Sequence, residues 1–115
     1  MRAEELLAIA EGLPDVELTD YRDATAITFR GHGFAHLRGD GRVLYVKSTR
    51  DEREAVVESD PETYSRWWES GRFGWIKIRL EHADGAEVIE LFTEAWRLCA
   101  PKRMVASYDL EHGLR

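Results

Sequence analysis

The sequence predicts an α+β domain, a two-layer sandwich in which helices cover one face of an antiparallel sheet. Two glycine turns join three short alternating segments, and a fourth alternating segment follows residue 71. Apolar stripes with helical spacing occur before, between and after these segments. The predicted sheet is therefore a three-stranded meander plus one further strand, with the helices packed on one face.

Length and composition narrow the class of protein. A chain of 115 residues corresponds to one domain, which we expect to span residues 1–115. The single cysteine, Cys99, forms no internal disulfide, and no apolar run reaches the ~18 residues that cross a membrane. We therefore expect a cytoplasmic protein without membrane association. The formal net charge of −6 argues against general nucleic-acid binding by the whole surface.

The first element in the chain is a predicted helix over residues 1–13. Its apolar residues recur at three- and four-residue spacing, and Gly12 and Pro14 end it. Residues 15–23 are acidic with little periodicity, so we expect an irregular connection there.

The meander follows, with strands predicted over residues 26–30, 34–38 and 43–47. Gly31-His32-Gly33 and Gly39-Asp40-Gly41 separate the strands, and glycine supplies the positive φ that tight turns require. Alternation within these strands predicts one buried and one open side. It places Phe34 on the open side.

Ser48 or Thr49 is predicted to cap the second helix, and Thr49 has Glu52 three residues later as in a capping box. This helix runs to about residue 59. Asp60-Pro61 then resembles the start of another helix, so we expect a short helix or helical turn before Gly71. That segment contains three large aromatic side chains, Tyr64, Trp67 and Trp68.

Residues 73–81 form the clearest predicted strand. Ile76, Ile78 and Leu80 alternate with Trp75, Lys77 and Arg79, so one side is apolar and the other aromatic and basic.

The last predicted elements are helical. Asp84 is expected to cap a long helix that ends at Cys99, since the apolar stripe there is the strongest in the chain. Pro101 then opens a short final helix, and the tail from Glu111 to Arg115 is expected to fray.

Charge is unevenly distributed among these elements. Residues 24–50 hold five bases and one acid, and residues 72–80 hold three bases and no acid, whereas the helical segments are mostly acidic. Cations interleaved with aromatic rings suit nucleic acid, because cations meet phosphates and rings stack on bases. The candidate binding residues on the open side of the sheet are Arg30, Phe34, His36, Arg38, Tyr45, Lys47, Trp75, Lys77 and Arg79.

A second interpretation of this surface stays open. Basic and aromatic residues are common at solvent-facing strand positions because they have good strand propensity and discourage edge pairing. The segment 64–68 or a partner subunit could also cover the rings.

Other candidate sites are weaker. His32 and His36 lie across a turn and do not have the spacing of zinc ligands, and Cys99 lies on an apolar stripe as an inert thiol would. We expect no catalytic residue, no cofactor and no bound metal. Weak cation binding is the alternative function of one acidic cluster, Glu4, Glu5, Glu11, Asp15 and Glu17.

Several short motifs, taken in order, resemble the MmcQ/YjbR-like proteins over nearly the whole chain. They are Leu13-Pro14-Asp15-Val16, Phe34-Ala35-His36-Leu37, Val43-Leu44-Tyr45-Val46-Lys47-Ser48, Gly74-Trp75-Ile76-Lys77-Ile78 and Glu94-Ala95-Trp96-Arg97-Leu98. The resemblance implies a fold like that of bacterial frataxin (CyaY). It also implies DNA binding, the label commonly given to these proteins for a proposed double-wing surface. Relatives often have Gly-Lys where this chain has His32-Gly33, so one expected cation is absent.

The sequence thus favours a non-enzymatic module that binds nucleic acid through the open side of the sheet. The alternative is a homodimer or protein-partner adaptor that uses that side or the Trp67-Trp68 pair. Frataxin-like weak metal binding by the acidic first helix is a further alternative.

Overall fold

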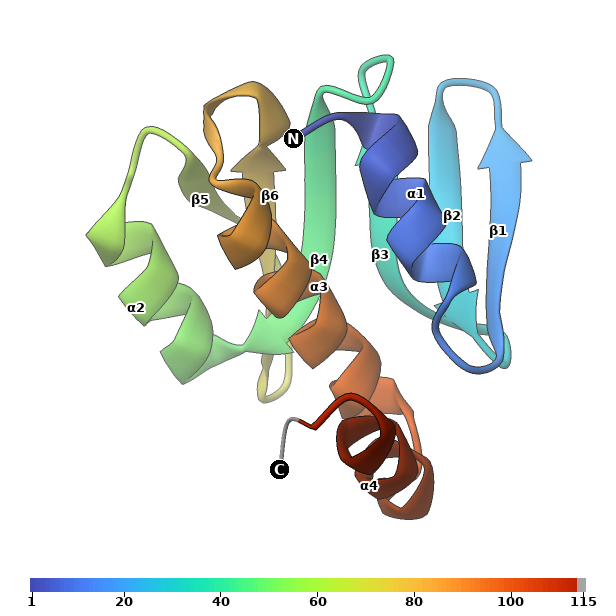
Figure 1. The fold of residues 1–115 in the computed structure, drawn as a ribbon. Helices are drawn as coiled ribbons and strands as arrows, with labels where there is room; N and C mark the ends of the chain where they lie inside the picture. Colours follow the sequence, from blue (N-terminus) through green and yellow to red (C-terminus); the bar gives the residue numbers. More distant parts are fainter. Residues whose placement is uncertain (114–115) are drawn as a thin grey trace.

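The structure, a computed structural model, describes residues 1–113 as a six-stranded sheet with four α-helices. The chain begins with helix α1 and ends with helix α4 (Figure 1). The elements in order are α1 (Ala3–Glu11), β1 (Val16–Tyr21), β2 (Ala24–Phe29), β3 (His32–Arg38), β4 (Val43–Thr49), α2 (Arg50–Ser59), β5 (Tyr64–Ser70), β6 (Phe73–Arg79), the short 3₁₀ helix η1 (Leu80–His82), α3 (Gly85–Cys99) and α4 (Lys102–Glu111).

The strands lie in the order β1-β2-β3-β4-β6-β5, and every neighbouring pair is antiparallel. The helices cover one face of this sheet, and no helix of residues 1–113 lies over the opposite face (Figure 1). The predicted α+β two-layer sandwich is confirmed. We call the uncovered side the open face.

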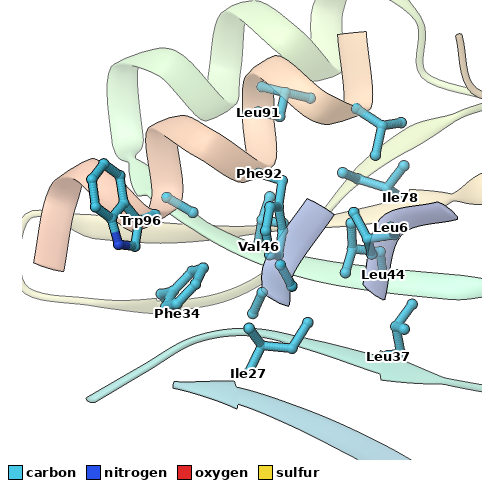
Figure 2. Packing of buried hydrophobic residues seen from close by; sticks show 14 of the residues in the cluster. Leu6, Ile27, Phe34, Leu37, Leu44, Val46, Ile78, Leu91, Phe92 and Trp96 are labelled. Atoms are coloured by element: carbon cyan, nitrogen blue, oxygen red, sulfur yellow. The ribbon is translucent and has the colours of Figure 1, made fainter. Parts of the chain in front are cut away.

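The core lies between the sheet and the helices (Figure 2). Leu6 of α1 and Phe92 of α3 are fully buried against strand residues such as Val46. Trp96 of α3 is also fully buried, and its indole N–H donates to the Pro14 carbonyl at 3.3 Å. This bond ties the end of α3 to the link between α1 and β1, so the two helices are positioned together.

Of the two predicted caps of the second helix, Thr49 is the one observed, and the predicted cap Asp84 is confirmed. The Thr49 hydroxyl accepts the Glu52 amide hydrogen at 3.2 Å, and the Asp84 carboxylate accepts that of Ala86 at 3.3 Å. Each cap satisfies an amide that the first helical turn leaves unpaired. The final helix also forms after Pro101, and Glu111 belongs to it. Residues 114–115 of the predicted frayed tail lie outside the described residues.

The expectation of an irregular connection over residues 15–23 is wrong, because Val16–Tyr21 forms edge strand β1. Val16 and Leu18 do alternate with polar residues and pack against the core. The acidic composition hid this short alternation, and pairing with β2 supplies the backbone hydrogen bonds.

The expected short helix or helical turn after Asp60 is correct only for a single turn, and it is wrong for residues 64–70. Residues 61–63 form a single turn, in which the Asp60 carbonyl accepts the Thr63 and Tyr64 amide hydrogens, and the chain then extends as edge strand β5. Pairing with β6 outweighs the local helix-start signal, since aromatic residues fit a strand well.

Phe34 does not lie on the open face, which corrects the alternation predicted for β3. Ile27 pairs with Ala35 and Thr28 pairs with Gly33, so Phe34 is an extra residue in a β-bulge. A bulge breaks the period of two. Phe34 therefore turns toward the helices, where it is fully buried with its ring centre 5.4 Å from that of Phe92 (Figure 2).

Candidate nucleic-acid interface

The centre of the open face is a cluster of four rings, which we call the aromatic cluster: His36, Tyr45, Trp67 and Trp75. His36 of β3 and Tyr45 of β4 are cross-strand partners and stack with ring centres 4.8 Å apart. The Trp67 ring centre lies 4.2 Å from that of Tyr45 and 5.9 Å from that of Trp75. Tyr45 is 8% exposed as a result, whereas Trp67 is 42% exposed.

This arrangement answers one of the questions that the sequence left open. Trp67, from the segment 64–68, does cover Tyr45 and His36 in part. It adds its own exposed ring to the same surface. The two aromatic patches considered separately from the sequence are therefore continuous.

His36 is the titratable member of the aromatic cluster. Its Nε2 atom is buried and has no hydrogen-bond partner among the described residues. Burial, and next the positive charge of Arg38, lower the pKa of His36 below its usual 6.5. The imidazole is therefore neutral at pH 7 and acts as a flat ring in the stack.

Four of the predicted cations lie on the strands that carry the aromatic cluster: Arg38, Lys47, Lys77 and Arg79, whose guanidinium donates to the Glu62 carbonyl at 3.5 Å. The sheet register places Lys77 opposite Tyr45 and Lys47 opposite Trp75. Arg38 lies 5.7 Å from the ring centres of both Tyr45 and Trp67, within the range of a cation–π contact. Within residues 1–113, none of the four cations forms an ion pair with a carboxylate.

Arg30, the remaining predicted cation, is not part of this surface. It follows β2 in the turn, with a positive φ of 47°, and its guanidinium forms an ion pair with Asp15 at 2.6 Å. The same group lies 5.0 Å from the ring centre of Phe29, a residue buried on the helix side. The structure thus groups seven of the nine predicted residues and separates Arg30 and Phe34 from them.

A bulge in β5 brings Trp67 and Trp68 to the open side. Arg66 pairs with Ile76 and Glu69 pairs with Gly74, so both tryptophans face the single residue Trp75. Simple alternation would have sent two adjacent residues to opposite faces. The adjacent tryptophans were visible in the sequence, but nothing in their spacing signalled the bulge.

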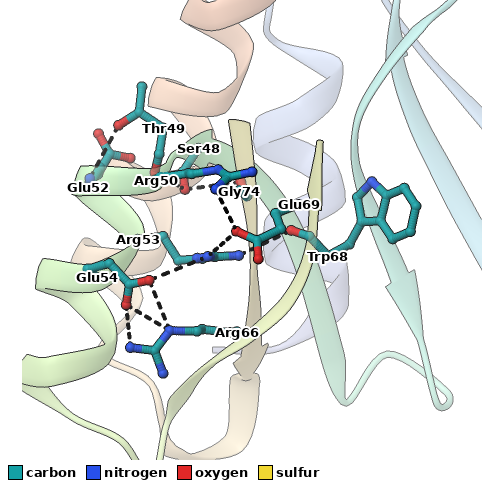
Figure 3. Close-up of polar contacts among 10 residues, drawn as sticks. All are labelled: Ser48, Thr49, Arg50, Glu52, Arg53, Glu54, Arg66, Trp68, Glu69 and Gly74. Carbon is teal, nitrogen blue, oxygen red and sulfur yellow. Dashed lines mark hydrogen bonds and ion pairs between the residues drawn. The ribbon is translucent and has the colours of Figure 1, made fainter. Parts of the chain in front are cut away.

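Arg53 of α2 holds this bulge from the helix side (Figure 3). Its guanidinium donates to the Trp68 carbonyl at 3.2 Å and to the Glu69 carboxylate at 3.0 Å, and its side chain is only 4% exposed. Trp68 points away from Arg53 and α2 in Figure 3. A buried network on one face therefore positions rings on the other.

Because Gly74 has no side chain, the Arg53 guanidinium can occupy the space beside it. A Cβ atom on Gly74 would lie 2.9 Å from the Cζ and Nε atoms of Arg53. The guanidinium therefore rests directly on the β6 backbone.

The other candidate sites show less organisation. Burial raises the pKa of the Cys99 thiol, with Lys47 acting weakly in the opposite direction, which disfavours a reactive thiolate. Within residues 1–113, no three His, Cys, Asp or Glu side chains group closely enough to hold a metal ion. Metal binding by α1 stays a prediction for which the described residues supply no ligand set.

Comparison with known proteins identifies the family. A family model described as YjbR matches residues 11–98. The chain belongs to the YjbR family. The match includes all six strands of the YjbR sheet and therefore the whole open face. The resemblance inferred from the sequence motifs is confirmed at the level of the family.

One solved structure supports the YjbR fold. The chain is similar to the Deinococcus radiodurans protein DR2400, described with a DUF419 domain, at a TM-score of 0.76. The similarity covers 100% of this chain and 91% of that chain, at 17% sequence identity, and at that identity it shows the fold alone. A search of curated proteins gave no match. Among the described residues, no helix has the length and apolar character needed to cross a membrane.

Proposed function

We propose that this YjbR protein is a non-enzymatic module that binds nucleic acid through the open face. One observation carries the proposal: four cations without ion-pair partners among residues 1–113 share with exposed aromatic rings a sheet face that no described helix covers. In such a complex the phosphates form ion pairs with the cations, and the bases stack on the aromatic rings. The DNA-binding label implied by the MmcQ/YjbR resemblance agrees with this function.

The distribution of charge reconciles this function with the net charge of −6. Helices α2 and α3 are acidic and lie on the opposite side of the sheet. A polyanion that approaches the open face meets Arg38 and Lys77 first, with the sheet and core between it and the helices. The acidic residue Glu17 lies on edge strand β1, where it pairs with Thr28 of β2, at the far edge of the sheet from the tryptophans of β5.

The test is binding of a fluorescein-labelled oligonucleotide in 50 mM salt, measured by anisotropy, for the wild type and for Lys77→Glu combined with Arg79→Glu. We expect the double variant to weaken binding at least about 10-fold, because two phosphate contacts become repulsive. Lys102→Glu combined with Arg103→Glu, which makes the same charge change on exposed α4, is the matched control. Absence of binding by the wild type, or equal loss in both double variants, would contradict the proposal.

A second candidate function is a homodimer or protein-partner adaptor that buries the same surface. The exposure of Trp68, at 56%, and of Trp67, at 42%, favours it, since exposed tryptophans are common at interfaces. Sedimentation velocity across protein concentrations distinguishes the two. A stable dimer in which acrylamide fails to quench Trp68 and Trp75 supports the adaptor, whereas a monomer with quenchable tryptophans supports the nucleic-acid interface.

A further inference from the structure

We infer that the ligand of the open face is single-stranded nucleic acid and that Trp68 is the ring on which an unpaired base stacks. This inference rests on the proposed function and specifies its substrate class. It follows from the width of the charged surface, from the packing of the rings and from the anchoring of the β5 bulge.

The charged and aromatic surface is too wide for a duplex groove. It extends over four adjacent strands, from Arg38 on β3 through β4 and β6 to the tryptophans on β5. Strand spacing of about 4.8 Å makes this roughly 14 Å between the outer strands, before side chains are added. The major groove of B-DNA is about 12 Å wide and admits a helix or a two-stranded ribbon. A duplex could contact the cations only through its backbone and would leave the rings unused.

The width of a groove does not restrict the binding of a single strand. Its bases can leave their stack and lie flat on a ring while its phosphates follow the neighbouring cations, as in other sheet surfaces that bind single strands. Base stacking of this kind tolerates any sequence, because every base has a π-face. The open face would accordingly show little sequence preference.

The side chains of Trp67 and Trp68 have different surroundings, and we assign them different roles in binding. The Trp67 ring already contacts His36, Tyr45 and Trp75, so much of its surface is occupied by the protein. Trp68 is more exposed and makes no ring contact with the described residues. Trp67 therefore extends the protein's own stack to the edge of the sheet, and Trp68 is free to receive a base.

Because the bulge already holds the Trp68 backbone in place, little conformational entropy is lost there when a ligand binds. Arg53 bonds the Trp68 carbonyl, and the same guanidinium is fixed by Glu69 and by contact with Gly74. The backbone is thus already ordered before any ligand arrives, and preorganisation of this kind favours affinity. Substitution of the Trp68 side chain keeps the backbone bond, so the variants below retain the bulge.

The experiment compares labelled dT15 with a 15-base-pair duplex in 50 mM salt, for the wild type, Trp68→Ala, Trp68→Leu and Trp68→Phe. We expect the wild type to bind dT15 at least about 10-fold more tightly than the duplex. Trp68→Ala and Trp68→Leu should each weaken dT15 binding about 10-fold or more and leave duplex binding unchanged, because both remove a stacking surface. Trp68→Phe should retain most of the affinity. The leucine variant separates stacking from simple apolar contact.

The outcomes separate this inference from the proposed function. Equal affinity for both oligonucleotides, with Trp68→Ala without effect and Lys77→Glu weakening both, would overturn the single-strand inference and leave nucleic-acid binding in place. Failure of the folded wild type to bind either oligonucleotide would overturn both. Circular dichroism and thermal unfolding verify that each variant is folded.

Discussion

Gly74 shows how one backbone position connects the two faces of the sheet. It pairs with Ser48 of β4 and Glu69 of β5, and the Arg53 guanidinium rests against its Cα. Any side chain here would displace a cation that is buried and held by several bonds. The absence of a Cβ atom is therefore what allows Arg53 to reach the β5 bulge.

We expect Gly74→Ala to lower the free energy of unfolding by about 1–3 kcal/mol, since the new methyl group overpacks against Arg53. Urea denaturation followed by circular dichroism measures the change. Gly33→Ala in β3 is the matched control, because its Cβ would meet no atom within 4 Å. Equal effects of the two substitutions would show that strand glycines matter here for a reason other than the Arg53 contact.

His36 is the second residue whose chemistry depends on its surroundings. Because burial and Arg38 lower its pKa in the fold, the unfolded chain takes up a proton at a higher pH than the native state does. Stability contributed by the neutral ring is complete above the unfolded pKa near 6.5 and falls as the pH drops below it.

Between pH 7.5 and 5.0 we therefore expect the wild type to lose more unfolding free energy than His36→Phe, which keeps a flat ring that does not titrate. Denaturant titrations at the two pH values give the comparison. His32→Phe, at an exposed site in the same strand, controls for removal of a histidine. A wild-type loss no larger than that of His36→Phe would mean that the ring is protonated freely in the fold.

At the scale of the elements, α2 and the β5–β6 hairpin form one unit. Arg53 and Arg66 bond the α2 residue Glu54, and Arg50 and Arg53 both reach Glu69 (Figure 3). These contacts lie at the edge of the sheet that carries the tryptophans. The geometry of the bulge is consequently set by a helix on the other face.

Two arginines of α2 test this coupling, since both pair with Glu69. Arg53 has a side chain 4% exposed, whereas Arg50 is 49% exposed. We expect Arg53→Met to reduce the unfolding free energy by about 2–3 kcal/mol, because it removes the donor of the part-buried Trp68 carbonyl and leaves Glu69 with only its exposed ion pair to Arg50. Arg50→Met should cost less than about 1 kcal/mol, as an exposed ion pair does. Similar losses for both variants in urea denaturation would argue against a special role of Arg53.

For the whole molecule, the segregation of charge predicts how binding responds to salt. If four cations each neutralise one phosphate of a single strand, log K should fall with log salt at a slope of about −3. Affinity for dT15 should then drop about 50-fold between 50 and 200 mM salt. Anisotropy titrations at several salt concentrations give the slope, and Lys77→Glu should make it shallower. A slope near zero would show that the cations contact no phosphate.

Local sequence patterns were sufficient for much of this fold. Period-two alternation identified β6, and the glycine turns identified the β2–β4 meander, because both depend on residues close together in the chain. The capping residues Thr49 and Asp84 were also predictable, since a cap is a contact across three residues at most. Helix α3 followed from its own apolar stripe.

The errors have a common physical cause, which is pairing between distant segments. Strands β1 and β5 are both edge strands with weak or contrary local signals, and each forms because a neighbour supplies hydrogen bonds. Phe34 changes face because of a bulge against β2. A bulge is a property of two strands together, so one strand's sequence does not reveal it.

By itself, then, the sequence determined the class of fold, the family motifs and the basic, aromatic character of the open face, all of which are local properties of composition and spacing. Only the tertiary structure decided which residues share that face. It places Arg30 and Phe34 away from the open face and Trp67 in the aromatic cluster. It also leaves the Trp68 ring exposed. The physical reason is that strand register, bulges and the buried Arg53 network arise from contacts between segments far apart in the chain.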